Sequence, residues 1–156
     1  RFDAGVRLGE SIDKDMIAMP ISPKLRMAAA ASPAHFKNHP VPKAPEDLTS
    51  HRCINIRFPT HGGLYVWEFE RRGRQVNVRV DGQATFNTSP HIVLAALDGL
   101  GVAFLPEDEF APHIEEGRLV RVLQDWCPPF PGYHLYYPSR RQHSPAFALV
   151  VDALRL

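Results

Sequence analysis

The sequence predicts an α/β fold, and three observations support that prediction. Short apolar stretches typical of strands alternate with helix-like stretches over most of the 156 residues. Ser-Pro pairs at residues 32–33, 89–90 and 144–145 indicate helix starts, because the serine can cap a helix and proline suits its first position. Residues 64–80 have the pattern of a β-hairpin. We therefore expect a largely parallel sheet with one antiparallel hairpin.

The first half of the chain contains three stretches that read as single strands. DAGVRL (3–8) predicts a short buried strand, and MAAAA (27–31) predicts a strand followed by the helix that Ser32 caps. A polar, proline-punctuated loop (39–48) with a short helical turn near its end leads into the alternating strand RCINIRF (52–58).

The hairpin is the clearest local pattern in the chain. Tyr65, Trp67 and Phe69 alternate with other residues on the first strand, and valines alternate on the returning strand after the turn RRGR. A further strand, QATFN (83–87), leads to the helix that Ser89 is expected to cap.

The stretch LAALDGLGVAFLPEDEF (94–110) contains two glycines in an apolar run. Gly99 suits the left-handed residue just past a helix, and Gly101 allows a tight entry into a buried parallel strand that Pro106 ends. The acids 107–109 suit the positive end of another helix, which ends near Gly117. A dinucleotide site is disfavoured, because its glycines follow a strand and precede a helix.

The last quarter of the chain returns to strand and helix. LVRVL (119–123) alternates like a strand, and the rigid segment WCPPFPG (126–132) has the character of a crossover. YHLYYP (133–138) predicts a strand that pairs with the strand at residues 3–8, since both have the apolar character of central strands. The final helix is expected to bury an apolar face formed by Phe147, Val150, Val151 and Leu154.

Composition excludes several classes of protein. Hydrophobic residues make up 44% and charged residues 22% of the chain, which is ordinary for a globular domain. The formal net charge of +1 gives no overall indication of nucleic-acid or anionic-membrane binding, and no apolar run is long enough to span a bilayer. We expect Cys53 and Cys127 to be free thiols in a cytoplasmic protein. Because the chain begins inside a strand without a methionine, we expect a missing upstream region.

The order of these segments resembles the C-terminal effector-binding domain of LysR-type transcriptional regulators. The segments that carry the resemblance span nearly the whole chain: DAGVRLGE, ASPAHF, HPVPKAPEDLTSHRCINIR, WEFERRGRQVNVRVDG, GLGVAFLPEDEFAPHIEEGRLVRVL and YHLYYPSRRQHSPAFALVVDAL. The resemblance implies a type 2 periplasmic-binding-protein-like, two-lobe Rossmann-like fold in which a small ligand lies between the lobes.

The resemblance also implies how the chain divides. Residues 1–18 would hold the end of lobe I and the first crossover, 19–125 lobe II, and 126–156 the second crossover and the return to lobe I. The first lobe would be incomplete in this chain. A DNA-binding helix-turn-helix domain would precede it, the protein would be a cytoplasmic homodimer or homotetramer, and it would be neither an enzyme nor membrane-bound.

The residues themselves give little support for catalysis or metal binding. The chain contains no Gly-x-Ser-x-Gly nucleophile motif. His35 and His39 have helical spacing that can hold a metal, but no third ligand lies nearby, so we expect no metal and no cofactor. His51 and Cys53 are expected to be structural, and the basic tip at 71–74 is interpreted as a solvated turn.

The candidate ligand site lies at two strand-to-helix junctions. Ser32 follows one strand, while Phe86, Asn87 and Thr88 end or follow another, and each junction offers free N–H groups at a helix start. Together the junctions suit a carboxylate or similar anion, although plain helix capping is the simpler interpretation of the serines. Arg7 is a candidate counter-charge, with a lobe–lobe ion pair as the alternative. A different class with the same architecture, a solute-binding protein of a transport system, remains open at this stage.

Overall fold

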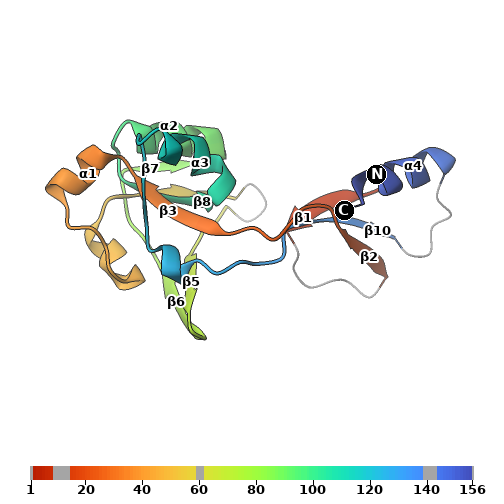
Figure 1. Cartoon of the computed structure of the whole chain (residues 1–156), viewed down its shortest axis with the longest axis horizontal. Coiled ribbons are helices and arrows are strands. Elements are labelled where there is room, and N and C mark those ends of the chain that lie inside the picture. Colours follow the sequence, from red (N-terminus) through yellow and green to blue (C-terminus); the bar gives the residue numbers. More distant parts are fainter. Residues whose placement is uncertain (1, 9–14, 59–61, 139–143, 156) are drawn as a thin grey trace. The chain divides into compact units, whose positions relative to one another are not determined.

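The chain forms two compact units, one built from both ends of the sequence and one from its middle. The structure, a computed structural model, describes residues 2–8, 15–58, 62–138 and 144–155. Unit 1 contains residues 1–25 and 129–156, and unit 2 contains Arg26–Pro128 (Figure 1). Unit 2 begins and ends a few residues later than the expected lobe at 19–125. One reason is a strand that the sequence pattern did not indicate, β2 (Met16–Pro20), which pairs within unit 1.

Unit 1 is a three-stranded antiparallel sheet with one helix. The strand order is β1 (Gly5–Leu8), β10 (Tyr133–Pro138) and β2. The expected pairing of the first strand with residues 133–138 is confirmed, with Val6 opposite Leu135. The expectation that the first strand is buried and central is wrong: β1 lies at the edge of the sheet, and Val6 is 54% exposed. Ser144 caps α4 (Pro145–Leu154), as expected.

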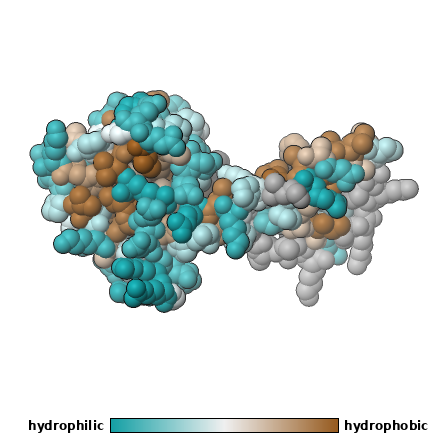
Figure 2. Space-filling model, in the orientation of Figure 1, coloured by the Kyte–Doolittle hydropathy of each residue, from teal (hydrophilic) through white to brown (hydrophobic). Residues whose placement is uncertain are grey.

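Helix α4 buries only part of its apolar surface among the described residues. Val151 packs with Leu135 and Tyr137, and Phe147 packs against that small cluster. Val150 is 51% exposed and Leu149 is 71% exposed, so the expected apolar face is only partly covered. Figure 2 shows apolar surface, in brown, on this unit.

Unit 2 contains a mixed five-stranded sheet. Its strands follow the order β7 (Ala84–Phe86), β4 (Cys53–Ile56), β8 (Val102–Pro106), β3 (Met27–Ala31) and β9 (Val120–Val122). β4 pairs in parallel with β7 and β8, but β3 is antiparallel to β8 and β9. The expectation of a largely parallel sheet is therefore wrong. Alternation of strands and helices in the sequence does not by itself fix the direction of each strand. Here β4, β7 and β8 run in one direction, and β3 runs in the opposite direction.

Two apolar layers cover the faces of this sheet. Helices α2 (Ser89–Leu97) and α3 (Glu107–Glu115) lie on one face, where their side chains pack against Ala28 and Ala30 of β3 (Figure 1). The other face, with Ala29 and Ala31, packs against the predicted hairpin, β5 (Trp67–Arg71) and β6 (Arg74–Val78). The remaining elements are the short α1 (Pro33–Asn38) and two 3-10 helices, η1 (Pro45–Ser50) and η2 (Gln124–Trp126).

The two glycines between α2 and β8 have different roles. Gly99 adopts φ +80°, and the N–H groups of Gly99 and Leu100 donate to Ala96 and Ala95, which ends the helix as predicted. At Gly101, a Cβ would lie 2.2 Å from the carbonyl oxygen of Arg52. Gly101 thus allows the loop before β4 to approach the start of β8.

Both cysteines are free and buried in unit 2. Burial raises the pKa of the Cys53 thiol to about 12, with a smaller contribution from the charge of Asp81. Burial likewise raises the pKa of Cys127 to about 11. Because the thiolate is the reactive form, both cysteines behave as apolar core residues at neutral pH.

Candidate functional site

The parallel strands of unit 2 end at one edge of the sheet, which we call the carboxyl edge. Phe86 of β7 lies opposite Ile56 of β4, and β8 runs beside β4 in the same direction. The chain leaves these strands toward α2, the 57–64 segment and α3, respectively. In open α/β sheets this edge is the usual position of a ligand, because loop side chains and helix N-termini converge there.

Asn87 and Thr88 lie at the carboxyl edge, directly after β7, and both are exposed. Thr88 is the N-cap residue of α2, but its side chain makes no capping hydrogen bond. Its hydroxyl instead lies 2.6 Å from Nδ1 of His91. The first turn of α2 also contains no acidic residue, so its N–H groups are not matched by a carboxylate of the same helix.

Ser89 does not cap α2, contrary to expectation. The helix begins at Ser89 itself, one residue earlier than a cap at that position requires. The Ser89 hydroxyl donates a hydrogen bond of 2.9 Å to Oε1 of Glu109 on α3. This contact joins the starts of the two helices at the carboxyl edge.

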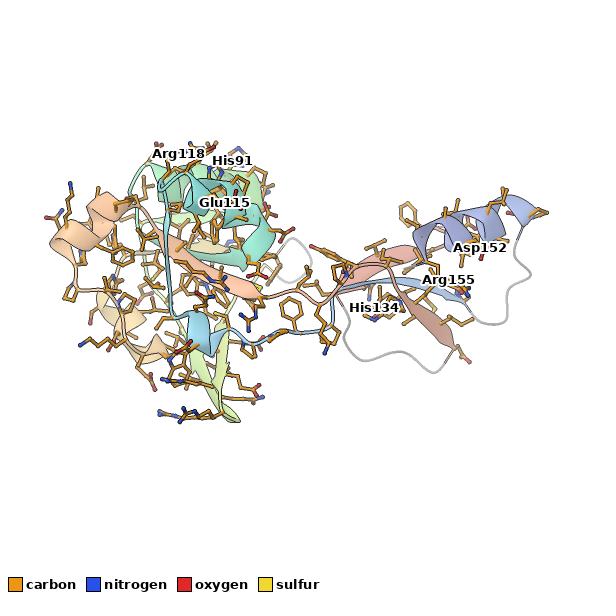
Figure 3. The ribbon with its side chains drawn as sticks, viewed as in Figure 1. His91, Glu115, Arg118, His134, Asp152 and Arg155 are labelled. Atoms are coloured by element: carbon orange, nitrogen blue, oxygen red, sulfur yellow. The ribbon has the colours of Figure 1, made fainter. Side chains whose placement is uncertain are left out.

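Phe86 provides an apolar surface beside these polar groups. Its side chain is half-buried, and its ring stacks on His91 with centroids 5.9 Å apart and an interplanar angle of 21°. His91 is labelled in Figure 3 on the helical side of unit 2. The end of β7 therefore combines one aromatic face with the hydroxyl of Thr88 and the amide of Asn87.

Arg121 and Glu107 form an ion pair near this edge that sequence analysis missed. The Arg121 guanidinium donates to Oε2 of Glu107 over 2.8 Å and to the carbonyl oxygen of Met27 over 3.1 Å. The Arg121 side chain is only 15% exposed. A charged residue at the centre of the short strand VRV was the available signal, because a mostly buried arginine needs a partner.

Ser32 lies at the opposite edge of the sheet from Asn87 and Thr88. Met27 is opposite Pro106 and Ala30 is opposite Ala103, so the end of β3 lies beside the start of β8. The expectation that the two strand-to-helix junctions act together is therefore wrong, because β3 is antiparallel to its neighbour. Ser32 is buried and caps α1, accepting the N–H of His35 over 3.3 Å.

Arg7 belongs to the other compact unit. It is an exposed residue of β1, and its register partner is His134 of β10. His134 is labelled in Figure 3 on the sheet of unit 1, and its Nδ1 lies 2.9 Å from the Gly132 carbonyl oxygen.

His35 and His39 form a histidine cluster with His51. Rings of His35 and His39 stack with centroids 4.3 Å apart, and Nε2 of His35 lies 2.9 Å from Nδ1 of His51. Burial, together with the neighbouring His39, His51 and Arg52, lowers the pKa of His35 to about 4. Burial also lowers the pKa of His51. Within the described residues, no group of His, Cys, Asp and Glu has the arrangement of a metal site.

Comparison with known proteins identifies the family of this chain. Residues 1–156 match the family described as the LysR substrate binding domain. The chain belongs to this family. Its similarity to the regulatory domain of AphB from Vibrio vulnificus has a TM-score of 0.81 at 25% sequence identity and covers 98% of this chain and 74% of that one. The two-lobe, periplasmic-binding-protein-like fold expected from the resemblance is thus confirmed.

Relatives of this LysR domain are regulators of transcription. The chain is 70% identical over 155 residues to the "Putative transcriptional regulator" of Pseudomonas aeruginosa, covering 99% of this chain and 51% of that protein. It is 48% identical over 155 residues to the HTH-type transcriptional regulator PgrR of Escherichia coli, covering 99% of this chain and 52% of PgrR. The chain spans about half the length of these relatives. These names favour a regulatory domain over the alternative of a transport solute-binding protein.

None of the helices in the described ranges combines the length and the hydropathy needed to cross a membrane.

Proposed function

We propose that this LysR domain senses a small anionic effector at the carboxyl edge of unit 2. The observation that carries the proposal is the junction between β7 and α2. There, Asn87 and Thr88 are exposed beside a helix start whose first turn contains no acid and whose cap residue makes no side-chain hydrogen bond to the backbone N–H groups of that turn. Unmatched N–H donors at a helix start attract negative charge, and the amide and hydroxyl add hydrogen bonds to an anion.

Phe86 and the nearby charged groups define what kind of effector fits. The half-buried Phe86 ring offers a surface for an apolar part of the molecule. The edge also carries the carboxylates of Glu107 and Glu109, the first engaged by Arg121 and the second by Ser89. An effector with one carboxylate and a small apolar part therefore suits the edge better than a highly charged anion. Arg7 of unit 1 is proposed as a further counter-charge, and Ser32 is assigned to helix capping.

The effector would act on the whole regulator through differential affinity. A ligand that binds one arrangement of lobes or subunits more tightly shifts the population toward that arrangement. In the intact protein, a cytoplasmic homodimer or homotetramer, this shift would reposition helix-turn-helix domains on DNA. The domain itself requires no catalytic step for this role.

The test removes one hydroxyl from the intact regulator. Small carboxylates that raise its thermal midpoint are first identified by a thermal-shift screen. The substitution Thr88→Val should then weaken the binding of these carboxylates about tenfold or more, as expected for one hydrogen bond to a charged group. The free energy of unfolding should change by less than about 1 kcal/mol, because the hydroxyl is exposed.

Thr49→Val provides the matched control. Thr49 is also an exposed threonine of unit 2, and its hydroxyl donates only to the carbonyl oxygen of Glu46 on the same 3-10 helix. This control should leave carboxylate binding unchanged. Equal binding by the wild-type protein and Thr88→Val would remove Thr88 from the site.

A further inference from the structure

A pocket lies beside β9, at the other side of the unit 2 sheet from the end of β7. It has a volume of about 360 Å³ and is lined by residues 41–43, Arg71 and residues 120–126. This volume lies within the usual range for small-molecule sites, roughly 300–1,000 Å³. β9 and β7 are the two edge strands, with three strands between them. At about 4.8 Å per strand spacing, this pocket lies about 19 Å across the sheet from the carboxyl-edge junction after β7.

Trp126 places an unsatisfied donor at this pocket. Only 7% of the residue is exposed, and its indole Nε1–H has no hydrogen-bond partner among the described residues. A buried N–H without a partner costs about 1–3 kcal/mol, so such groups are rare in folded proteins. A ligand with a hydrogen-bond acceptor could satisfy this donor after a small adjustment of the ring.

Positive charge surrounds the same tryptophan. The Arg71 guanidinium lies 5.7 Å from the centroid of the Trp126 ring, and that of Arg74 lies 5.9 Å from it. Arg74 forms a salt bridge of 3.0 Å with Glu46, but the contact between Arg71 and Asp125 is loose, at 3.8 Å, and exposed.

Lys43 adds a second cation to the pocket lining. Its ammonium forms no salt bridge with any residue in the described ranges. Lys43 and Arg71 are the cations of the lining that a ligand can reach, whereas the guanidinium of Arg121 is engaged by Glu107 and Met27. Asp125, which lies 3.8 Å from Arg71, also lines the pocket, so the cations outnumber the acid. The pocket thus favours an anion.

The backbone at the pocket adopts a conformation that is uncommon for its residue type. Leu123 is buried and has φ 54° and ψ 31°, in the left-handed region, which costs roughly 1–2 kcal/mol for a residue with a Cβ. This turn directs the chain from β9 into η2, which carries Trp126. Residues with such strained backbone conformations occur often at ligand sites, where the free energy of binding can offset the strain.

Besides the polar Gln124 and the acidic Asp125, the remaining walls of the pocket are apolar. Val41 is 52% exposed and Val120 is 38% exposed, and Pro42, Val122 and Leu123 complete this lining. We propose that the pocket is a second ligand site, distinct from the carboxyl edge, for a small carboxylate with a flexible apolar chain. The carboxylate is recognised by Lys43, Arg71 and the Trp126 N–H, and the chain packs on the valines.

The experiment follows Trp126 directly in the intact regulator. The protein is labelled with 5-fluorotryptophan, and the Trp126 signal in the ¹⁹F NMR spectrum is identified as the one absent from Trp126→Phe. Sodium hexanoate is titrated at constant ionic strength, with hexanamide as an uncharged analogue of the same shape. Hexanoate should shift the Trp126 signal saturably in the millimolar range. Hexanamide should bind at least about tenfold more weakly, as expected for the loss of about 1.4 kcal/mol.

Variants of the two cations separate specific binding from general charge attraction. Lys43→Gln and Arg71→Gln should each weaken hexanoate binding about fivefold to tenfold. Arg72→Gln removes the same charge from the same hairpin, but Arg72 does not line the pocket, so this control should stay within twofold of wild type. No saturable shift, equal shifts with hexanoate and hexanamide, or an equal effect of Arg72→Gln would each overturn the proposal.

Thr88→Val distinguishes this site from the carboxyl edge. The variant should retain the hexanoate-induced shift of Trp126, since Thr88 lies across the sheet from the pocket. Loss of the shift in Thr88→Val would assign the effect to the carboxyl edge and overturn the second site. Failure of Thr88→Val to change effector binding would count only against the proposed function.

Discussion

At the scale of single residues, the same Ser-Pro pair serves two purposes. Ser32 and Ser144 each accept the backbone N–H three residues later and cap the following helix. Ser89 is already the first residue of its helix, so its hydroxyl is available to bind Glu109. Helix α2 begins at the serine of its Ser-Pro pair, whereas α1 and α4 begin at the proline. Because of this difference of one residue, Ser89 links two helices and does not cap one.

Gly101 gives the sharpest prediction at this scale. The substitution Gly101→Ala would place a Cβ 2.2 Å from the carbonyl oxygen of Arg52 and 2.7 Å from its carbonyl carbon. Because backbone on both sides must move, we expect a loss of about 2–3 kcal/mol in the free energy of unfolding, measured by urea denaturation.

Gly63→Ala is the control for Gly101→Ala. Beyond its chain neighbours, a Cβ at Gly63 would meet no atom of the described residues within 4 Å. This variant should remain within about 0.5 kcal/mol of wild type. Similar stabilities for the two alanine variants would show that the approach of the Arg52 loop to β8 is not tight.

At the scale of elements, the histidine cluster joins α1 to the segment before β4. His35 comes from α1, and His51 follows η1 and accepts or donates the 2.9 Å hydrogen bond between their rings. This hydrogen bond requires at least one neutral ring, so it is lost when both His35 and His51 are protonated. Burial, and then the neighbouring His39, His51 and Arg52, disfavour a charge on His35.

The pH dependence of unit 2 should follow from this cluster. The pKa of His35 is about 4 in the folded protein, below its ordinary value of 6.5, so the unfolded chain binds more protons between these values. The stability contributed by His35 is therefore present above pH 6.5 and is lost as the pH falls toward 4. Thermal unfolding should show this decrease, and His35→Asn should make the decrease shallower.

His113→Asn is the matched control for the pH experiment. His113 is a half-buried histidine of α3 that contacts Arg118 and, among the described residues, no other histidine. Its substitution should preserve the decrease in stability between pH 6.5 and 4. If His113→Asn and His35→Asn alter the pH profile equally, the cluster is not its source.

At the scale of the whole molecule, unit 1 exposes apolar surface that a longer chain could cover. Leu149 is 71% exposed and Val6 is 54% exposed. The chain covers 74% of the AphB regulatory domain and about half of its regulator relatives. In an intact regulator of the relatives' length, a segment that packs on α4 would bury this apolar surface.

Leu149→Glu should therefore have opposite effects in two contexts. In residues 1–156 alone, the charge interrupts an exposed apolar patch and should reduce aggregation and binding of an apolar fluorescent dye. In the intact regulator, the same charge would be buried without a partner and should destabilise unit 1 by about 2 kcal/mol or more.

Leu154→Glu tests how far the covered surface extends. Leu154 lies on the last turn of α4 and is 39% exposed. Light scattering and thermal unfolding of both chain lengths provide the measurements. If Leu149→Glu leaves the stability of the intact protein unchanged, no segment covers that side of α4.

Local sequence patterns determined the individual elements of this protein. The strand at 27–31, the hairpin, the end of α2 at Gly99 and the final helix each depend on residues within a few positions of one another, so capping, alternation and backbone preference sufficed to predict them. The ordered set of elements also sufficed for the LysR resemblance, which the family match confirms. The position of Asn87 and Thr88 directly after a strand was likewise predicted from the local pattern.

Only the tertiary structure decided the direction of β3 and what followed from it. That direction depends on pairing between Met27 and Pro106, which lie far apart in the sequence, and no local pattern encodes it. Because β3 is antiparallel to β8, Ser32 lies at the opposite edge of the sheet from Asn87 and Thr88. Pairing with β9 and the fold of the loop after α1 also brought Lys43, Arg71 and Trp126 around one pocket. Local propensities act within a few residues, whereas strand order and pocket composition depend on the packing of the whole sheet.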